Sequence, residues 1–292
     1  MTFSEKLKNN CFVITAEIAP PRGINYEKIL EEIKPLKSKI DAFNVTDCQR
    51  SMLRMSAISM SKLLLDKGFE PILQLTCRDR NRIALQSELL GAAALGIKNV
   101  CLMTGDFTTL GDVPQAKPVF DLDSVQLIKS VNDMNKGKLI NGKDLDKPTS
   151  FTIGSVYNPF AGPKKLQIWK LEKKIKAGAE FIQTQPVYEI NKAKEVAETI
   201  RELKGKAIIG LLPIRSVKMA NFIEKLNPGS IPSHLKEKIE KAENPADYGW
   251  KYTIELAKAI SEFADGVHFM LIGKIRDLSD FITSLKNNHG RP

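Results

Sequence analysis

The stretch FVITAEIAPPRGINYEKILEEIKPLKSKIDAFNVT (residues 12–46) predicts a strand, a helix and a second strand, in that order. FVITAEI (12–18) and DAFNVT (41–46) are short and rich in apolar and β-branched residues, which is typical of buried strands. YEKILEEIKPL (26–36) carries apolar residues at helical spacing. The turn after the first strand reads APPRG, not the GxGxxG of a dinucleotide-binding open sheet.

The same alternation continues to the end of the chain. Further strands are expected at 71–76, 98–105, 151–156, 180–185, 206–214 and 265–272. Helices are expected at 51–68, 80–96, 121–135, 164–178, 191–205, 216–226, 232–242, 245–263 and 276–286. Regular alternation favours parallel strands with right-handed crossovers. Eight such units in 292 residues predict one closed (β/α)8 barrel, a TIM barrel, whose usual length is roughly 250 residues. We expect a single domain over 1–292; an open doubly wound sheet is the alternative.

Composition limits the classes of partner. The net charge is +10, but the lysines are spread along helices such as 164–176 and 234–241, with no dense arginine block. This indicates a solvated basic surface that can steer anionic ligands and no nucleic-acid partner. No apolar run approaches the ~18 residues that cross a bilayer. The N-terminus is polar, lacks a signal-peptide core and is expected to lead straight into the first strand. We therefore expect a soluble, cytoplasmic protein with no membrane partner.

Cysteine and histidine usage argues against a metal site. The sequence has four cysteines and three histidines, and no CxxC pair, so a zinc site is not expected. Buried free thiols are the plain interpretation of the cysteines. Cys48 and Cys77 follow predicted strands, which leaves a role in lining a site open.

In a β/α barrel the chemistry is carried at the carboxyl ends of the strands. Glu17 interrupts the first predicted strand, where burying an unpartnered carboxylate is costly. Burial raises the pKa of a carboxyl group and makes it a usable general acid near neutral pH. The alternative is a structural glutamate paired with Arg22 or with a lysine of a neighbouring strand.

Two further strand ends carry polar groups. Thr104, Gly105 and Asp106 follow the fourth strand, where glycine permits close approach of a ligand and Asp106 can accept a hydrogen bond; a simple turn is the alternative. Gln183 and Gln185 share one face of the sixth strand, and their amides suit a heterocycle such as a pterin; polar filling of the barrel mouth is the alternative. The strand ends lack a carboxylate cluster for a metal, a Ser-His-Asp arrangement and a lysine poised for a Schiff base.

Six segments in this order resemble the methylenetetrahydrofolate reductase family, from about residue 12 to 285. They are TAEIAPPRG (15–23), FNVTDCQRS (43–51), LQLTCRDRNR (73–82), LMTGD (102–106), KKIKAGAEFIQTQPVYE (173–189) and GLLPI (210–214). The third and fourth are closer to the short branch, acetogen-type or fused to homocysteine methyltransferase, than to the enterobacterial enzyme.

The resemblance implies a TIM barrel that binds FAD non-covalently. It further implies hydride transfer from reduced flavin to 5,10-methylenetetrahydrofolate, which gives 5-methyltetrahydrofolate. Glu17 matches the family's general acid, which protonates N10 as the imidazolidine ring opens. Asp106, the second predicted catalytic residue, matches the aspartate near flavin and pterin that helps set the flavin potential and bind folate. Gln185 matches the glutamine that contacts folate. The predicted flavin-binding residues are Thr46, Gln74, Thr104, Gly105, Asp106, Ser155, Val156 and Lys174. The predicted substrate-binding residues are Gln183, Gln185, Val217 and Met270.

Four positions depart from the enterobacterial pattern. Val217 replaces an aromatic residue, Met270 a tyrosine, Thr104 an arginine and Gln74 a histidine. The first three changes weaken the case for direct NAD(P)H binding. The electron donor stays open between NADH, NADPH, ferredoxin and a partner subunit, and an oligomer is compatible with the sequence.

Two other functions remain open. One is a pterin-binding TIM-barrel methyltransferase that acts with a corrinoid protein and contains no flavin. The other is a flavin-carrying subunit that is active only within a larger complex. A flavin spectrum of the purified protein excludes the first, and activity with an artificial donor excludes the second.

Overall fold

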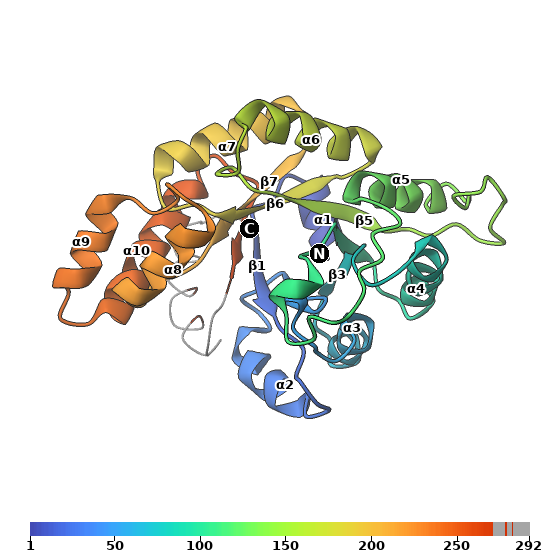
Figure 1. The fold of residues 1–292 in the computed structure, drawn as a ribbon, viewed down its shortest axis with the longest axis horizontal. Helices are drawn as coiled ribbons and strands as arrows, with labels where there is room; N and C mark the ends of the chain where they lie inside the picture. The colour runs from blue at the N-terminus through green and yellow to red at the C-terminus, as the bar shows by residue number, and fades with distance from the viewer. Residues whose placement is uncertain (271–277, 279–281, 283–292) are drawn as a thin grey trace.

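A computed structural model describes residues 1–270 together with 278 and 282. Eight parallel strands pair in sequence order and β8 pairs with β1, so the sheet closes into a barrel (Figure 1). The strands are β1 (Val13–Ile18), β2 (Ala42–Val45), β3 (Pro71–Thr76), β4 (Asn99–Met103), β5 (Thr152–Tyr157), β6 (Phe181–Pro186), β7 (Lys206–Leu211) and β8 (Gly266–Phe269). The predicted TIM barrel is confirmed.

Helices surround this barrel. They are α1 (Phe3–Lys8), α2 (Glu27–Ile33), α3 (Ala57–Asp66), α4 (Arg82–Ala94), α5 (Ser124–Met134), α6 (Lys164–Ala177), α7 (Ile190–Glu202), α8 (Val217–Leu226), α9 (Ser233–Lys241) and α10 (Pro245–Ile260), with short 3-10 turns η1 (Lys34–Leu36), η2 (Gln49–Ser51) and η3 (Thr108–Leu110). Helices α8, α9 and α10 lie together on one side of the barrel (Figure 1). Among the described helices, none has the length and apolar character needed to cross a bilayer.

Most predicted elements agree with the structure within a few residues. The helix expected at 51–68 begins only at Ala57, because Gln49–Ser51 form a separate turn with left-handed residues. The seventh strand ends at Leu211, three residues before its predicted end. The helix expected at 276–286 lies outside the described residues except for the buried Leu278 and Ile282.

The N-terminal segment is helical, which corrects the expectation that it leads directly into the first strand. Thr2 and Glu5 form a reciprocal capping box that begins α1, and this pattern is readable in the sequence. The Phe3 ring contacts the Phe181 ring edge-on at 5.3 Å between centroids. The backbone N–H of Phe3 donates to Glu70 at 2.9 Å. Helix α1 therefore packs against the amino-terminal end of the barrel, away from the strand ends that carry the candidate site.

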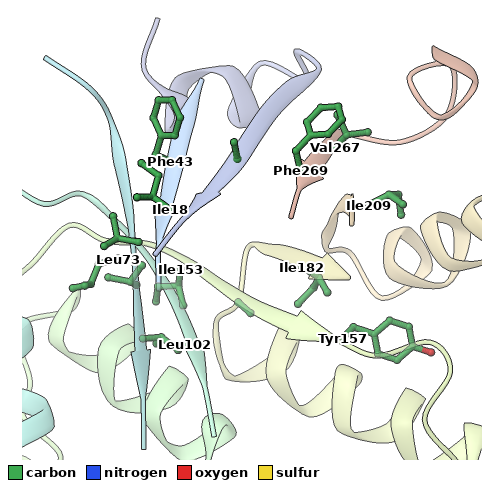
Figure 2. Close-up of a cluster of buried hydrophobic side chains, with 14 of the residues drawn as sticks. Ile18, Phe43, Leu73, Leu102, Ile153, Tyr157, Ile182, Ile209, Val267 and Phe269 are labelled. Carbon is green, nitrogen blue, oxygen red and sulfur yellow. The ribbon is translucent and has the colours of Figure 1, made fainter. Parts of the chain in front are cut away.

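Strand alternation sorts apolar side chains into two cores. One set faces the helices, and Figure 2 shows Ile18, Phe43, Leu73, Leu102 and Ile153 among its members. The other set fills the lower barrel interior and comprises Phe3, Leu7, Val13, Ala42, Ile72, Cys101, Phe181 and Ile208. Because side chains two apart share a face, the next inward position on β1 after Val13 is Thr15, and the one after that is Glu17.

The interior core predicts one sharp packing constraint. A Cβ at Gly154 would lie 2.1 Å from Cζ of Phe181, so Gly154→Ala overpacks the barrel. We expect a loss of about 1–3 kcal/mol in the free energy of unfolding, measured by urea titration. Gly91→Ala is the matched control: it lies within α4 with nothing within 4 Å of the added atom and should gain up to about 1 kcal/mol from helix propensity. Equal stability of the two variants would contradict this description of the interior.

Candidate active site

A polar layer lies on top of the apolar layer in the barrel interior. Asn44 of β2 and Gln183 of β6 exchange side-chain hydrogen bonds of 2.6 and 3.0 Å across the interior. Gln183 Nε2 also donates to Thr15 Oγ1 at 3.4 Å, and Thr15 Oγ1 lies 2.9 Å from His268 Nδ1. Burial lowers the pKa of His268 to about 3, so this histidine is neutral. The layer is thus a neutral, hydrogen-bonded floor.

The floor separates the two predicted substrate-binding glutamines. Gln183 is 2% exposed and its amide is engaged with Asn44 and Thr15. Gln185 lies two residues further along β6, nearer the mouth, and is partly exposed. The pairing of β6 with β7 shifts register between Gln183 and Pro186. Of the pair, Gln185 is the one open to a ligand. Contact of either with substrate stays a prediction.

Glu17 stands one step above the floor on β1. Its carboxyl oxygens accept hydrogen bonds from Gln49 Nε2 at 3.1 and 3.3 Å. Burial raises the pKa of Glu17 from 4.5 to about 7, against the smaller lowering effect of the Gln49 amide. No ion pair of Glu17 occurs within the described part of the chain; Arg22, the expected structural partner, pairs with Asp112 at 3.3 Å. The structural pairing with Arg22 that was the alternative is therefore not made, and the catalytic role of Glu17 stays a prediction.

The loop after β2 connects the two predicted catalytic carboxylates. Gln49 binds Glu17 through its side chain, and the backbone N–H of Arg50 donates to Asp106 Oδ2 at 3.0 Å. Cys48, Arg50 and Ser51 all have positive φ, between 45° and 56°. A non-glycine residue in this region costs on the order of 1–2 kcal/mol. Such strain is typical of functional sites.

Contacts with the loop after β4 hold this strained turn in place. Ser51 Oγ donates to the carbonyl of Phe107 at 2.9 Å. Leu53 N–H donates to Asp112 at 2.8 Å. A Cβ at Gly111 would lie 1.9 Å from the carbonyl oxygen of Ser51, so the two loops pack backbone to backbone. The long loop after β4 therefore supports the 48–51 turn.

A partly buried ion pair fixes the ends of β2 and β3. Asp47, 4% exposed, accepts hydrogen bonds from the backbone N–H and hydroxyl of Thr76, both at 2.9 Å, and from Arg80 at 2.8 and 3.2 Å. Gly105 approaches the same place with φ +95°, and a Cβ there would lie 2.9 Å from Cβ of Thr76. Glycine is therefore required where the β4 end meets the β3 end.

The predicted flavin-binding residues differ in where they lie. Some are buried near the strand ends, and others face the helices or the solvent. Thr46, directly after β2, and Gln74 on β3 are buried. Thr46 Oγ1 has no hydrogen-bond partner among the described residues. Lys174 reaches from α6 to the carbonyl of Val156 at 2.6 Å, and burial lowers its pKa to about 8. Ser155 instead shares the outer face of β5 with Ile153, and its hydroxyl donates to the carbonyl of Leu102 at 2.7 Å. Thr104 is exposed, with Oγ1 accepting from Ser124 N–H at 3.3 Å.

Val217 and Met270 lie together at another part of the rim. Both are partly buried and pack on one apolar cluster that includes Tyr188, Leu212 and Ile214. The structure thus joins the start of α8 to the end of β8. Whether this cluster contacts substrate stays a prediction.

Comparison with known proteins identifies the family of this chain. The family model described as methylenetetrahydrofolate reductase matches residues 2–285. The chain belongs to the methylenetetrahydrofolate reductase family. A curated relative from Caenorhabditis elegans, "Probable methylenetetrahydrofolate reductase (NADPH)", is 24% identical over 246 residues. That match covers 79% of this chain and 34% of the relative, so the chain spans about a third of the relative's length.

Similarity to solved structures supports only the fold of this reductase-family chain. A protein studied from Aquifex aeolicus VF5 matches with a TM-score of 0.56 and 15% identity, covering 98% of this chain and 96% of that one. A 2,3-dimethylmalate lyase of the PEP mutase/isocitrate lyase superfamily matches with a TM-score of 0.51 and 11% identity, covering 99% and 87%.

Several groups at the site of this family member had no role assigned from the sequence. Gln49 and the Asp47–Arg80 pair stand after predicted strands, but nothing in the sequence marks them as bonded to Glu17 or to Thr76. Phe107 and Phe222 are 66% and 42% exposed, and the Arg50 guanidinium lies 5.4 Å from the Phe222 ring centroid. Left-handed conformation at three non-glycine residues gives no compositional signal, so the turn was not predictable.

Glu17 should make stability depend on pH. The folded-state pKa of about 7 lies above the ordinary 4.5. Between these values Glu17 ionises in the unfolded chain but stays largely protonated in the fold, so stability falls as pH rises. Glu17→Gln should therefore gain stability over the unmodified chain across that window, by at most about 3 kcal/mol, and keep the gain at higher pH. Urea unfolding at about pH 5 and pH 8 measures it. A difference that is the same at both pH values would show an ordinary carboxyl group.

Proposed function

We propose that this chain reduces 5,10-methylenetetrahydrofolate to 5-methyltetrahydrofolate, with FAD as the bound redox cofactor. The observation that carries the proposal is the Glu17 carboxyl: partly buried in the barrel mouth, bonded to a neutral amide and raised to a pKa of about 7. Family membership supports the same reaction class. A group with this pKa is present in both protonation states near neutral pH, as general acid catalysis requires.

The residues present fit a flavin. Thr46 Oγ1 is buried without a partner in the described chain, and a native buried hydroxyl normally has one. Gly105 lets the backbone approach β3 closely, where a Cβ would not fit. We propose that Thr46, Gln74, Gly105, Asp106 and Lys174 hold the flavin, with Thr104 and Val156 in the surrounding wall. Ser155 is left out of this set because it faces the helices and its hydroxyl is bonded to Leu102. When bound, FAD supplies the hydride.

The chain's own residues perform the proton step. Glu17 donates its proton to N10 of the folate, which opens the five-membered ring and leaves a cationic carbon able to accept hydride. The neutral floor of Thr15, Asn44, Gln183 and His268 supplies no counter-charge beneath Glu17. The carboxyl therefore stays protonated at higher pH than an exposed one.

Polar groups at the rim of the barrel orient the pterin in this proposal. We propose that the Gln185 amide pairs with the heterocycle, since an amide offers both donor and acceptor. Asp106, held by Arg50 N–H, contributes negative charge beside the site. Electrons reach the flavin from NAD(P)H or from a partner subunit, and Val217 and Met270 line the rim where such a donor would enter.

An anaerobic assay with reduced viologen tests this function, because viologen needs no nicotinamide subsite. We expect the purified chain to carry flavin and to reduce methylenetetrahydrofolate. Glu17→Gln should keep the flavin and its reduction by viologen while folate reduction falls by about 10²–10⁴-fold, the usual contribution of a general acid. Normal folate turnover by Glu17→Gln would reject the acid assignment. A colourless protein with no released flavin would reject the reductase.

Thr46 provides an independent test of the cofactor. Thr46→Val removes a buried hydroxyl that lacks a protein partner, so the flavin-free protein should be as stable or more stable. Flavin affinity should fall by roughly tenfold, the effect of one lost hydrogen bond. Equilibrium dialysis gives the affinity and thermal unfolding of the flavin-free protein the stability. Unchanged flavin affinity would remove Thr46 from the cofactor site.

A further inference from the structure

Gln49 is exposed, yet its side chain is ordered against the Glu17 carboxyl group. Its side chain lies on the loop after β2 and is solvent-exposed. Within the described chain, the hydrogen bonds of this side chain are the two from Nε2 to the Glu17 oxygens, at 3.1 and 3.3 Å. An exposed glutamine gains little by ordering its long side chain unless the contact has a use, because the side-chain entropy is lost.

The backbone around Gln49 is built to present it. The residue before it and the two after it, Cys48, Arg50 and Ser51, have left-handed backbones, and loops relax to other conformations unless the surrounding structure prevents it. Ser51 is held by the carbonyls of Asp106 and Phe107, and Met55 N–H donates to the carbonyl of Pro21 at 2.9 Å. Fixed at both ends, the turn points one neutral amide at one carboxyl group.

The amide acts on the two protonation states of Glu17 differently. The Gln49 NH2 group can only donate, and a donor stabilises a carboxylate more than a carboxylic acid. We propose that Gln49 is a positioning residue, which holds the Glu17 carboxyl in the barrel mouth and stabilises the carboxylate that remains once its proton has been transferred. This inference rests on the proposed function and names a second residue in its proton step.

Gln49 is the group that stabilises the Glu17 carboxylate, because no charged group on the neighbouring described elements is among the influences on its pKa. The influences on the pKa of Glu17 are burial, which raises it, and the Gln49 hydrogen bond, which lowers it. Among the described residues, the titratable and charged groups of the surrounding strand ends include three ion pairs, Asp47 with Arg80, Arg22 with Asp112 and Arg78 with Asp79. They also include Cys48, Arg50, Arg54, Asp106, Arg215 and the neutral His268. Without the amide, the carboxyl would be a weaker acid.

Two variants separate the proposed role from simple packing. Gln49→Leu keeps the size of the side chain and removes the donor. Gln49→Glu keeps the shape and places a second carboxyl beside Glu17, which raises the pKa of Glu17 further by like-charge repulsion. Gln115→Leu is the matched control, an amide-to-alkyl change on the exposed loop after β4.

The first readout does not require activity. The stability gain of Glu17→Gln starts near the ordinary pKa of 4.5 and stops rising at the folded-state pKa of Glu17. The pH range of the gain therefore reports the titration of Glu17 in the fold, and it can be measured in each background by urea unfolding. We expect the midpoint of this pH-dependent gain to move upward in Gln49→Leu, to move further in Gln49→Glu and to stay in place in Gln115→Leu. An unmoved midpoint in Gln49→Leu would overturn the inference.

The second readout is the pH profile of folate reduction. In Gln49→Leu the alkaline limb should move upward while the plateau kcat falls about threefold to tenfold, because a weaker acid transfers its proton less readily; KM should change little. A loss confined to KM would overturn the inference. If Glu17→Gln abolishes turnover while Gln49→Leu leaves midpoint and limb in place, the inference fails and the proposed function stands. If the midpoint shifts but the chain never reduces folate, Gln49 does hold the Glu17 carboxyl. In that case only the proposed function is rejected.

Discussion

The alternation of side chains along β1 is the constraint on which the site depends. Val13 lies in the apolar interior and Thr15 in the polar floor, so Glu17 must point into the mouth of the same barrel. Its carboxyl is partly removed from water, above a floor without charge. Desolvation then raises the pKa to about 7, and the chemistry proposed for the site follows from that single placement.

The surrounding structure stabilises an arrangement that is unfavourable in isolation. A buried carboxylate and three left-handed residues each raise the free energy of the folded state. The Asp47–Arg80 pair, with Thr76, fixes the strand ends beneath the turn, and the loop after β4 packs directly against Ser51. Site and scaffold therefore depend on one another. The loops that bring Glu17 and Asp106 together are also the loops that hold the strained backbone of the 48–51 turn in place.

The fold was predictable from the sequence, and the site only in outline. Hydrophobic periodicity located the eight strands and most helices because both are properties of local sequence. It also put Glu17, Gln185 and Asp106 at strand ends. It missed α1, whose Thr2–Glu5 capping box was readable, and it did not separate Gln183 from Gln185, since depth within a barrel depends on pairing across strands. The Gln49 contact arises from long-range backbone geometry that single-residue patterns do not encode.

The most direct test of this account is an infrared titration of Glu17 in the unmodified protein, with Glu17→Gln as the reference spectrum. The carbonyl stretch of a protonated carboxylic acid is distinct from the bands of a carboxylate. The account predicts a protonated-acid band that is absent in Glu17→Gln, present at about pH 5.5 and half lost near pH 7. A Glu17 carboxyl that is already ionised at about pH 5.5 would contradict it.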